Sequence, residues 1–195
     1  MWNERYRQTD YFYGTAPNDF LAEHVGVLPK GRILCLAEGE GRNAVFLAEQ
    51  GYDVVAVDGS EMGREKALQL AESRGVSIAY HVCDLAEFEL GTEAWAGVVS
   101  IFAHVPPHTR RKIHQNMARA LKPEGVFLLE AYAPPQLQNS TGGPKNVELL
   151  MELTKIRAEL DGMTEMIGQE LERSVVEGRG HTGWACVTQW IGRKK

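Results

Sequence analysis

Residues 32–44 read RILCLAEGEGRNA, and this stretch decides the fold of the chain. Its four consecutive apolar residues, 33–36, predict a buried strand, and Gly39 and Gly41 then form a turn tight enough to lead directly into a helix. Because glycine has no Cβ, the backbone of such a turn can approach a ligand closely, which makes this unit a cradle for a nucleotide. The spacing Gly39-x-Gly41-x-x-Ala44 also fits the dinucleotide fingerprint in which alanine replaces the third glycine.

Two carboxylates on this turn favour one class of nucleotide over another. Glu38 and Glu40 would lie beside the pyrophosphate of a dinucleotide, and like charges at that range disfavour binding by about 1 kcal/mol or more. The same carboxylates suit a ligand with an ammonium and a sulfonium group, a description that S-adenosylmethionine (SAM) meets. The alternative is that Glu40 is solvated and that only Glu38 contributes to binding.

The composition is that of one globular domain without a nucleic-acid surface. The 195 residues carry a formal net charge of −5, and the basic residues are dispersed, which argues against nucleic-acid binding. No stretch has the pattern of a signal peptide or a membrane span. The three cysteines (Cys35, Cys83 and Cys186) lie far apart, as expected of reduced thiols in a cytoplasmic protein. His104 and His108 have no cysteine or carboxylate at ligand spacing, so no metal site is predicted.

Two further acids follow predicted strands, at the edge of the sheet where an adenosine would bind. Asp58 ends the second strand, about twenty residues after the glycine turn, where a carboxylate accepts the ribose hydroxyls. Ser60 already provides a cap for the next helix, which favours ribose binding as the role of Asp58. Asp84 ends the third strand and would accept a hydrogen bond from the adenine amino group while Leu85 covers the ring. A second interpretation stays open for Asp84, as the cap of a short helix at residues 85–90.

The order of the predicted elements gives an α/β fold. Strands alternate with helices as far as the fifth strand, and the last two strands form a hairpin. We therefore expect a doubly wound, mostly parallel seven-stranded sheet with a C-terminal antiparallel hairpin. The strands are predicted at residues 33–36, 52–57, 76–83, 95–102, 126–132, 165–176 and 183–192. Helices are expected from residue 17, from residue 60, within 106–121 and after residue 146.

Two irregular segments complete a single domain of residues 1–195. Residues 1–16 are rich in aromatic side chains and are predicted to form an irregular N-terminal flap, which packs on the body or closes over a cofactor cation. Residues 133–146 form a long polar loop that can fold over a site as a lid.

The sequence resembles the class I SAM-dependent methyltransferases. The resemblance is strongest to the small bacterial branch with the TehB-type tellurite-resistance and thiopurine methyltransferases. It spans nearly the whole chain and is carried by Trp2-Asn3-Glu4-Arg5-Tyr6, Tyr13-Gly14, Pro17-Asn18, Ala37-Glu38-Gly39-Glu40-Gly41-Arg42-Asn43, Val57-Asp58, Asp84-Leu85, Leu121-Lys122-Pro123-x-Gly125, Thr141-Gly142-Gly143-Pro144 and His181-Thr182-Gly183. It implies a Rossmann-like methyltransferase fold.

The resemblance also implies roles for individual residues. Residues 38–41 would hold the methionine part of SAM, Asp58 the ribose, and Asp84 with Leu85 the adenine. The family's usual first glycine of the turn is Ala37 here, and its usual acid in the first strand is Cys35, so Glu38 would take the acidic role at the ammonium. The complete set of cofactor-binding residues that we predict is Ala37, Glu38, Gly39, Gly41, Asn43, Asp58, Gly59, Met62, Asp84, Leu85, Phe102 and Ala103.

Methyl transfer needs little from side chains beyond alignment. The reaction is an in-line displacement on a sulfonium, and correct alignment can contribute about 7–11 kcal/mol. A soft nucleophile needs only deprotonation near neutral pH. We place Tyr13, His104, His181 and Arg179 around the acceptor, with His181, Tyr13 and His104 as the catalytic candidates. His181 would act as a base or as a hydrogen-bond donor; the alternative is a solvated loop histidine.

The leading hypothesis is a SAM-dependent methyltransferase for a small molecule or small ion. A thiol, or a species derived from a selenium or tellurium oxyanion, is the expected acceptor, with no nucleic-acid or membrane partner. One alternative is a nicotinamide-dependent oxidoreductase that uses the turn from Gly39 to Ala44. The other is a non-catalytic module that binds an adenosyl compound. No feature indicates an oligomeric state.

Overall fold

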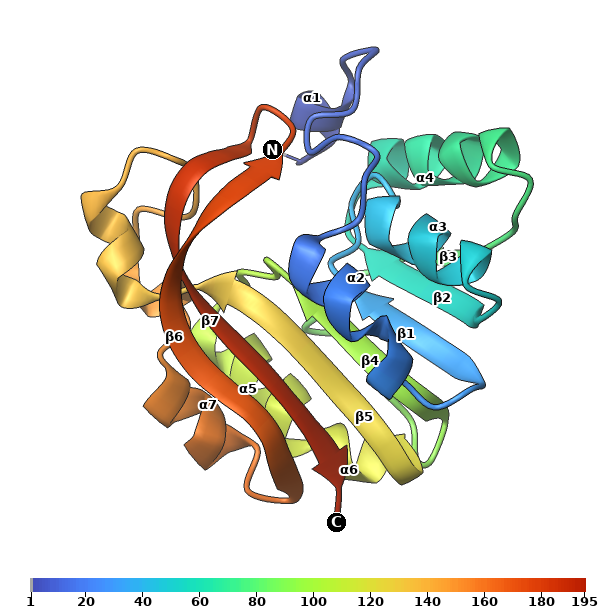
Figure 1. Ribbon diagram of the computed structural model, residues 1–195. Coiled ribbons are helices and arrows are strands. Elements are labelled where there is room, and N and C mark those ends of the chain that lie inside the picture. Colours follow the sequence, from blue (N-terminus) through green and yellow to red (C-terminus); the bar gives the residue numbers. More distant parts are fainter. Residues whose placement is uncertain (1) are drawn as a thin grey trace.

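The computed structural model describes residues 2–195 and contains a seven-stranded sheet with the order β3-β2-β1-β4-β5-β7-β6 (Figure 1). Neighbouring strands from β3 to β5 are parallel, and β7 is antiparallel to both β5 and β6. The predicted fold class is therefore confirmed. The strands are β1 (Arg32–Leu36), β2 (Asp53–Asp58), β3 (Ala79–Val82), β4 (Trp95–Ile101), β5 (Leu121–Tyr132), β6 (Met163–Glu177) and β7 (His181–Lys194).

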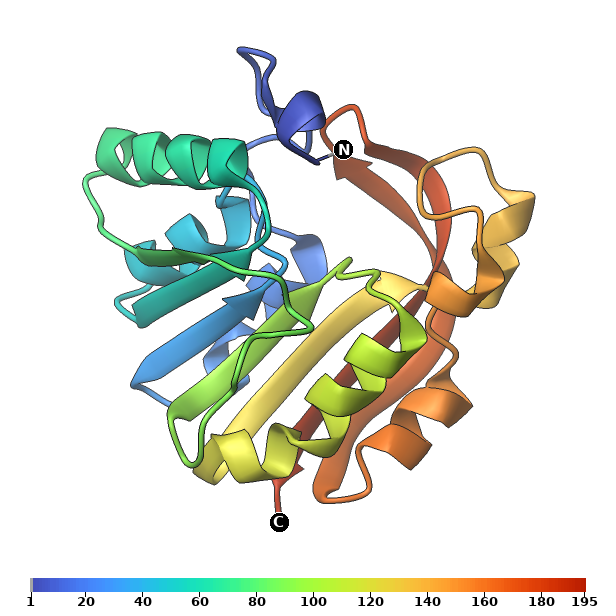
Figure 2. The same ribbon diagram turned by 180° about the vertical axis from the view of Figure 1, so that it is seen from behind.

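Helices cover both faces of this sheet, as Figures 1 and 2 show from opposite sides. The α-helices are α1 (Trp2–Tyr6), α2 (Asp19–His24), α3 (Arg42–Glu49), α4 (Glu61–Ser73), α5 (Pro107–Gln115), α6 (Met117–Ala120) and α7 (Leu153–Glu159). Three short 3-10 helices join them: η1 (Val25–Val27), η2 (Pro134–Gln138) and η3 (Val147–Leu149). Within the described residues, no helix has the length and apolar character needed to cross a membrane.

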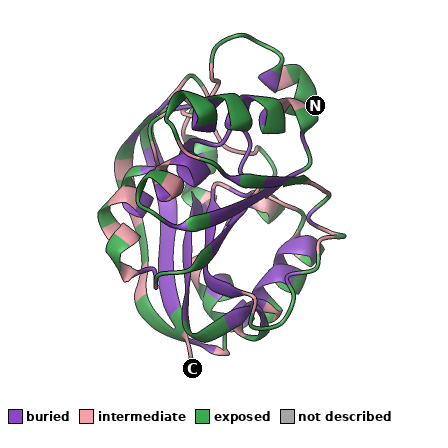
Figure 3. Cartoon of the chain, turned by 90° about the vertical axis from the view of Figure 1, so that its right-hand side faces the viewer, coloured by how far each residue is buried: buried purple, intermediate pink, exposed green. Residues whose placement is uncertain are grey.

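The side chains of each central strand point alternately to the two faces of the sheet, and the core therefore has two layers. Ile33 and Cys35 of β1 pack with α2, α3 and α4 on one face, whereas Leu34 and Leu36 pack with α5, α6 and α7 on the other. Successive side chains of a strand point to opposite faces, so a strand covered on both sides becomes apolar throughout. Figure 3 shows the result as buried central strands.

The β6–β7 hairpin extends past the sheet and meets the N-terminal segment (Figure 1). Tyr132, the last residue of β5, pairs with Val187, so residues 181–186 of β7 project beyond the carboxyl ends of the parallel strands. We call residues 177–181 the hairpin tip and residues 10–14 the strap. The backbone N–H groups of Arg179 and Gly180 both donate to the carbonyl of Phe12. The strap and the hairpin tip together form an arch over the ligand edge of the sheet.

Four predictions of local structure are corrected. The flap is not wholly irregular, because α1 forms at its start. Residues 85–90 form turns and not a helix, and the helix expected at 106–121 breaks into α5 and α6, with Leu121 already in β5. The helix expected after residue 146 is replaced by η3 and the separate α7.

Candidate functional site

The glycine turn after β1 has a backbone that few residues adopt. Ala37, Gly39 and Gly41 all have positive φ, at 51°, 61° and 90°. A side chain at Gly41 would collide with Ala67 of α4, since an added Cβ would lie 2.5 Å from the Ala67 Cβ. Ala37 stands where the resembled family has glycine, and its left-handed conformation gives the physical reason for that glycine.

Glu38 lies inside this turn and caps α3. One carboxylate oxygen, Oε1, accepts hydrogen bonds from the backbone N–H groups of Asn43 and Ala44, at 3.0 and 2.8 Å. Burial raises the pKa of Glu38 to about 7, although the two N–H groups and Arg42 act in the opposite direction. This position does not favour the predicted role at a ligand ammonium, since the buried carboxyl already stabilises the helix N-terminus and is partly protonated at neutral pH.

Glu40 is buried, so the interpretation of Glu40 as a solvated residue is wrong. Its side chain pairs with Lys66 of α4 at 2.6 Å, and both side chains are less than a tenth exposed. The other carboxylate oxygen accepts the backbone N–H groups of Phe12 and Tyr13, at 2.8 and 3.3 Å. Lys66 also donates to the carbonyl of Asp10. Glu40 therefore holds the strap against the glycine turn, and Lys66 neutralises its charge.

Asp58 lies at the carboxyl end of β2, next to the glycine turn. Its two oxygens accept the N–H groups of Gly39 at 3.0 Å and of Ser60 at 2.9 Å. Burial raises the pKa of Asp58, and these N–H groups oppose part of that rise. Ser60 caps α4 as predicted, by accepting the N–H of Gly63. Asp58 thus links the first two strand ends, with Gly59 and Met62 beside it at the start of α4.

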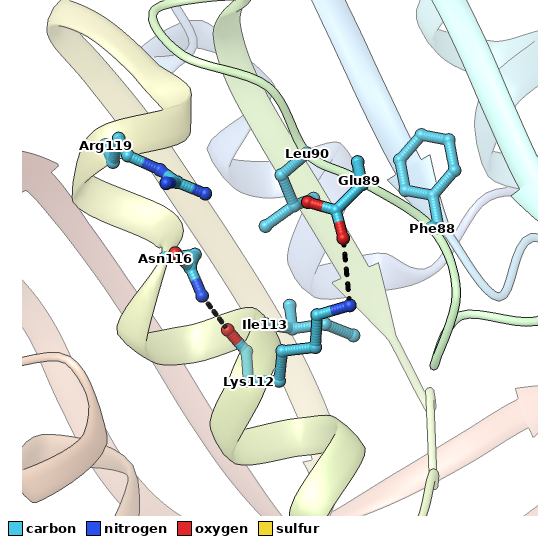
Figure 4. Close-up of a pocket in the computed structure, with 7 residues that line it drawn as sticks. All are labelled: Phe88, Glu89, Leu90, Lys112, Ile113, Asn116 and Arg119. Atoms are coloured by element: carbon cyan, nitrogen blue, oxygen red, sulfur yellow. Dashed lines mark hydrogen bonds and ion pairs between the residues drawn. The ribbon is translucent and has the colours of Figure 1, made fainter.

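A small apolar hollow lies at the carboxyl ends of β1 and β4. Its free volume is only about 10 Å³, room for about one water molecule, and the predicted residues Leu85 and Ala103 are part of its lining. The lining consists of Leu36, Leu85, Ser100, Ala103, Val105, Arg110, Ile113, His114 and Met151. Asp84 is exposed beside the buried Leu85, with one oxygen accepting the Ala86 N–H. A second hollow, between residues 88–90 and α5 (Figure 4), contains none of the predicted site residues.

Aromatic side chains gather beyond the ends of β4 and β5. We call Tyr13, Phe102, Tyr132 and His181 the aromatic box. The His181 ring lies 4.5 Å from the rings of both Tyr13 and Phe102 and 5.2 Å from that of Tyr132, measured between centroids. Phe102 has a φ of 51°, a strained conformation of the kind that occurs at functional sites. Gly142, within the predicted lid 133–146, packs against the box, because a Cβ on it would lie 3.2 Å from both the Tyr132 hydroxyl and the His181 ring.

His104 lies beside the box with both ring nitrogens engaged. Nδ1 donates to the carbonyl of Leu149 at 2.8 Å, and Nε2 accepts the N–H of Tyr132 at 3.3 Å, which fixes a neutral tautomer. Burial lowers the pKa of His104 to about 4. Its ring stacks on Tyr132, so the geometry suits a role in holding Tyr132 more than a role in proton transfer.

His181 is buried against a carboxylate that the sequence reasoning missed. Its Nδ1 lies 3.7 Å from Glu177 Oε2, longer than a hydrogen bond. Burial alone would raise the pKa of Glu177, yet its contacts with His181, Arg42 and Asn18 lower that pKa to about 2. Burial lowers the pKa of His181, and Glu177 offsets only part of the effect, so the imidazole is neutral at pH 7. His181 is not the solvated loop histidine of the alternative interpretation.

Glu177 belongs to a buried polar network behind the box. The Asn18 side chain donates to both Glu130 and Glu177 at 2.7 Å, and Arg42 pairs with Glu177. Asn43 was predicted to bind the cofactor. Its side-chain oxygen instead accepts the backbone N–H of Asn18. Two other predicted residues lie at the arch: Tyr13, whose hydroxyl accepts from Arg5, and Arg179, which pairs with Asp10 at the surface.

These residues fit an adenosyl cofactor in two respects. The carboxylate of Asp58 lies at the second strand end, and the exposed Asp84 precedes Leu85 in the lining of the apolar hollow. The glycines serve the packing of the chain itself, since a Cβ on Gly39 would meet the Tyr6 hydroxyl at 2.7 Å and one on Gly41 would meet Ala67. When bound, SAM would be held by Asp58 at the ribose and by Asp84 with Leu85 at the adenine. The electrostatic reasoning from Glu38 and Glu40 does not support this fit, because one carboxyl caps a helix and the other pairs with Lys66.

Comparison with known sequences finds a family match for part of the chain. Residues 33–125 match the family described as "Methyltransferase domain". The tRNA 5-carboxymethoxyuridine methyltransferase of Escherichia coli (strain K12) is 30% identical over 106 residues, which are 53% of this chain and 41% of that enzyme. The chain thus spans less than half of the length of this curated relative. This match agrees with the predicted enzyme class and methyl donor.

Comparison with solved structures supports the fold over the full length. A structure described as "Conversion of a Disulfide Bond into a Thioacetal Group during Echinomycin Biosynthesis" has a TM-score of 0.80 at 17% identity, covering 100% of this chain and 90% of the other. TehB from Haemophilus influenzae has a TM-score of 0.74 at 18% identity, covering 100% of this chain and 66% of TehB. At these identities the likeness establishes the fold and not the branch of the family.

Proposed function

From the match of residues 33–125 to the methyltransferase domain family, we propose that the whole chain transfers a methyl group from SAM to a small acceptor. The acceptor that we favour is a thiol or a reduced species derived from a selenium or tellurium oxyanion. The observation that carries this proposal is the position of the aromatic box, which lies at the ligand edge of the sheet and includes the predicted cofactor residue Phe102.

The cofactor side of the site uses the ends of the first four strands. Asp58 binds the ribose, and Asp84 and Leu85 bind the adenine over the apolar hollow. Bound SAM supplies a methyl group already activated by a sulfonium. The chain therefore has to align the acceptor, exclude water and remove a proton.

His181 is placed to remove that proton. Its ring turns Nδ1 toward Glu177, and Cδ2, the carbon next to Nε2, faces Gly142 of the predicted lid. A neutral imidazole accepts a proton at Nε2, and the ionised carboxylate then stabilises the imidazolium through Nδ1. Tyr13 and Phe102 enclose the imidazole, and His104 holds Tyr132 in place.

The arrangement favours a small acceptor over the tRNA on which the curated relative acts. The box is closed by the strap, the hairpin tip and the lid, and the chain has a net charge of −5. A nucleic-acid substrate would instead require a positively charged surface to neutralise phosphates.

Two measurements test the proposal. Calorimetric titration with SAM should show saturable binding at micromolar concentration, and Asp58→Ala should weaken it. His181→Gln should lower methyl transfer by about 10²–10⁴-fold while SAM affinity changes little. An absence of SAM binding at millimolar concentration, or a binding signal for NADH in a fluorescence titration, would contradict the proposal.

A further inference from the structure

The hydroxyl of Tyr132 is a buried polar atom without a hydrogen-bond partner. Among residues 2–195, only Tyr132 Oη and His181 Nδ1 are buried side-chain polar atoms left unpaired. His181 Nδ1 faces the Glu177 carboxylate at 3.7 Å, close enough for electrostatic attraction but not for a hydrogen bond. Nothing in the described chain accounts for the Tyr132 hydroxyl, although an unpaired buried hydroxyl costs about 1–3 kcal/mol.

The Tyr132 hydroxyl and the proton-accepting edge of His181 face the same point. The position that a Cβ on Gly142 would occupy lies 3.2 Å from Tyr132 Oη, 3.2 Å from His181 Cδ2 and 2.4 Å from the carbonyl oxygen of Gly180. In the closed chain this point is therefore filled by the backbone of Gly142 and Gly180. Because Tyr132 is fully buried, a ligand reaches the point only when the lid segment 141–144 moves aside.

The cations near the box are already paired. Arg5 donates to the Tyr13 hydroxyl, and the other three arginines of this region pair with carboxylates. They are Arg42 with Glu177, Arg173 with Glu130 and Glu177, and Arg179 with Asp10. An anionic acceptor would therefore have to draw Arg5 away from the Tyr13 hydroxyl and from the rings of Trp2 and Phe12, or break one of these ion pairs, to gain a cation at this point.

Resting on the proposed function, we infer that Tyr132 and His181 together bind the acceptor as a neutral, protonated X–H species. The Tyr132 O–H donates to X, because burial raises the pKa of Tyr132 and keeps its proton in place. The X–H proton passes to His181 Nε2 as the X–C bond forms, and the electron pair of the broken methyl–sulfur bond stays on the cofactor sulfur. A neutral thiol or selenol meets this description, whereas an oxyanion does not.

Three thiols of similar size provide the test of charge: 2-mercaptoethanol is neutral, mercaptoacetate is anionic and cysteamine is cationic. With SAM bound to the full chain, kcat/KM for 2-mercaptoethanol should exceed that for mercaptoacetate by at least about tenfold, since an uncompensated buried charge costs more than a lost neutral contact. Equal or better use of mercaptoacetate would overturn the inference.

Tyr132→Phe provides the test of the hydroxyl. The variant should lower kcat/KM for 2-mercaptoethanol by about 10-fold, as expected for the loss of one hydrogen bond of about 1.4 kcal/mol. Its melting temperature should equal or exceed that of the parent, because the hydroxyl has no partner to lose. An unchanged kcat/KM in the variant would overturn this inference and leave the proposed function standing. SAM binding without methyl transfer to any of the three thiols would overturn both this inference and the proposed acceptor class.

Discussion

Glu38→Gln should change how the stability of the chain depends on pH. In the folded chain the pKa of Glu38 is about 7, against an ordinary value of 4.5, because burial disfavours the carboxylate. Folding therefore binds a proton between these two pH values, and the free energy of unfolding falls as pH rises through this interval. At about 1.4 kcal/mol per tenfold change in the protonation equilibrium, Glu38 lowers the stability above pH 7 by about 3 kcal/mol.

Urea denaturation at pH 4.5, 6, 7 and 8 measures this effect. Glutamine keeps an oxygen for the N–H groups of Asn43 and Ala44 but does not ionise, so its stability relative to the parent should rise by about 3 kcal/mol between pH 4.5 and pH 8. Glu65→Gln on the exposed face of α4 is the control and should change stability by less than about 0.5 kcal/mol. A pH-independent difference between parent and Glu38→Gln would show that Glu38 is already ionised, and would restore it as a candidate partner for the ligand ammonium.

Three other substitutions test the turn and its neighbours. Asp58→Asn should weaken SAM binding by about 10–100-fold in calorimetry, because a charged acceptor is lost at the ribose; unchanged affinity would place the ribose elsewhere. Ala37→Gly should stabilise the chain by about 1 kcal/mol, because Ala37 has a φ of 51°, and its melting temperature should rise by about 2–4 °C; a fall would show that the Ala37 methyl group matters more than backbone strain. Glu40→Gln and Lys66→Met should each cost about 3–5 kcal/mol in urea denaturation, and the double variant less than their sum; additive losses would mean that the pair is not coupled.

Much of the fold could be predicted because the buried strands are marked in the sequence by runs of apolar residues. Apolar runs such as 33–36 are typical of strands buried on both faces, and glycines mark the turns that follow them. Helix boundaries were less predictable. Leu121 continues an apolar helical spacing, yet it enters β5, where it pairs with Trp95. Local spacing does not reveal when pairing with a neighbouring strand replaces the last helical turn.

In the candidate site, too, features local in sequence could be predicted and contacts between distant segments could not. The positions of Asp58 and Asp84 at the ends of β2 and β3 could be predicted, because a buried strand fixes the place of the residue at its end. Glu40 was misread because its partner Lys66 lies on another helix, and sequence position gives no sign of that pairing. Glu177 and Tyr132 were missed for a similar reason, since the arch that brings them to His181 exists only in the folded chain. The one available signal was Tyr132 itself, an aromatic residue at the end of a predicted strand.

The arch also sets the order in which the site can be completed during synthesis. The strap is translated early, but the Phe12 carbonyl receives its two N–H donors from Arg179 and Gly180, more than 160 residues later. A growing chain can therefore form the central strands and the glycine turn long before it can close them. Contacts so distant in sequence form slowly, and until they form the aromatic side chains of the N-terminal segment stay available to chaperones or to other chains.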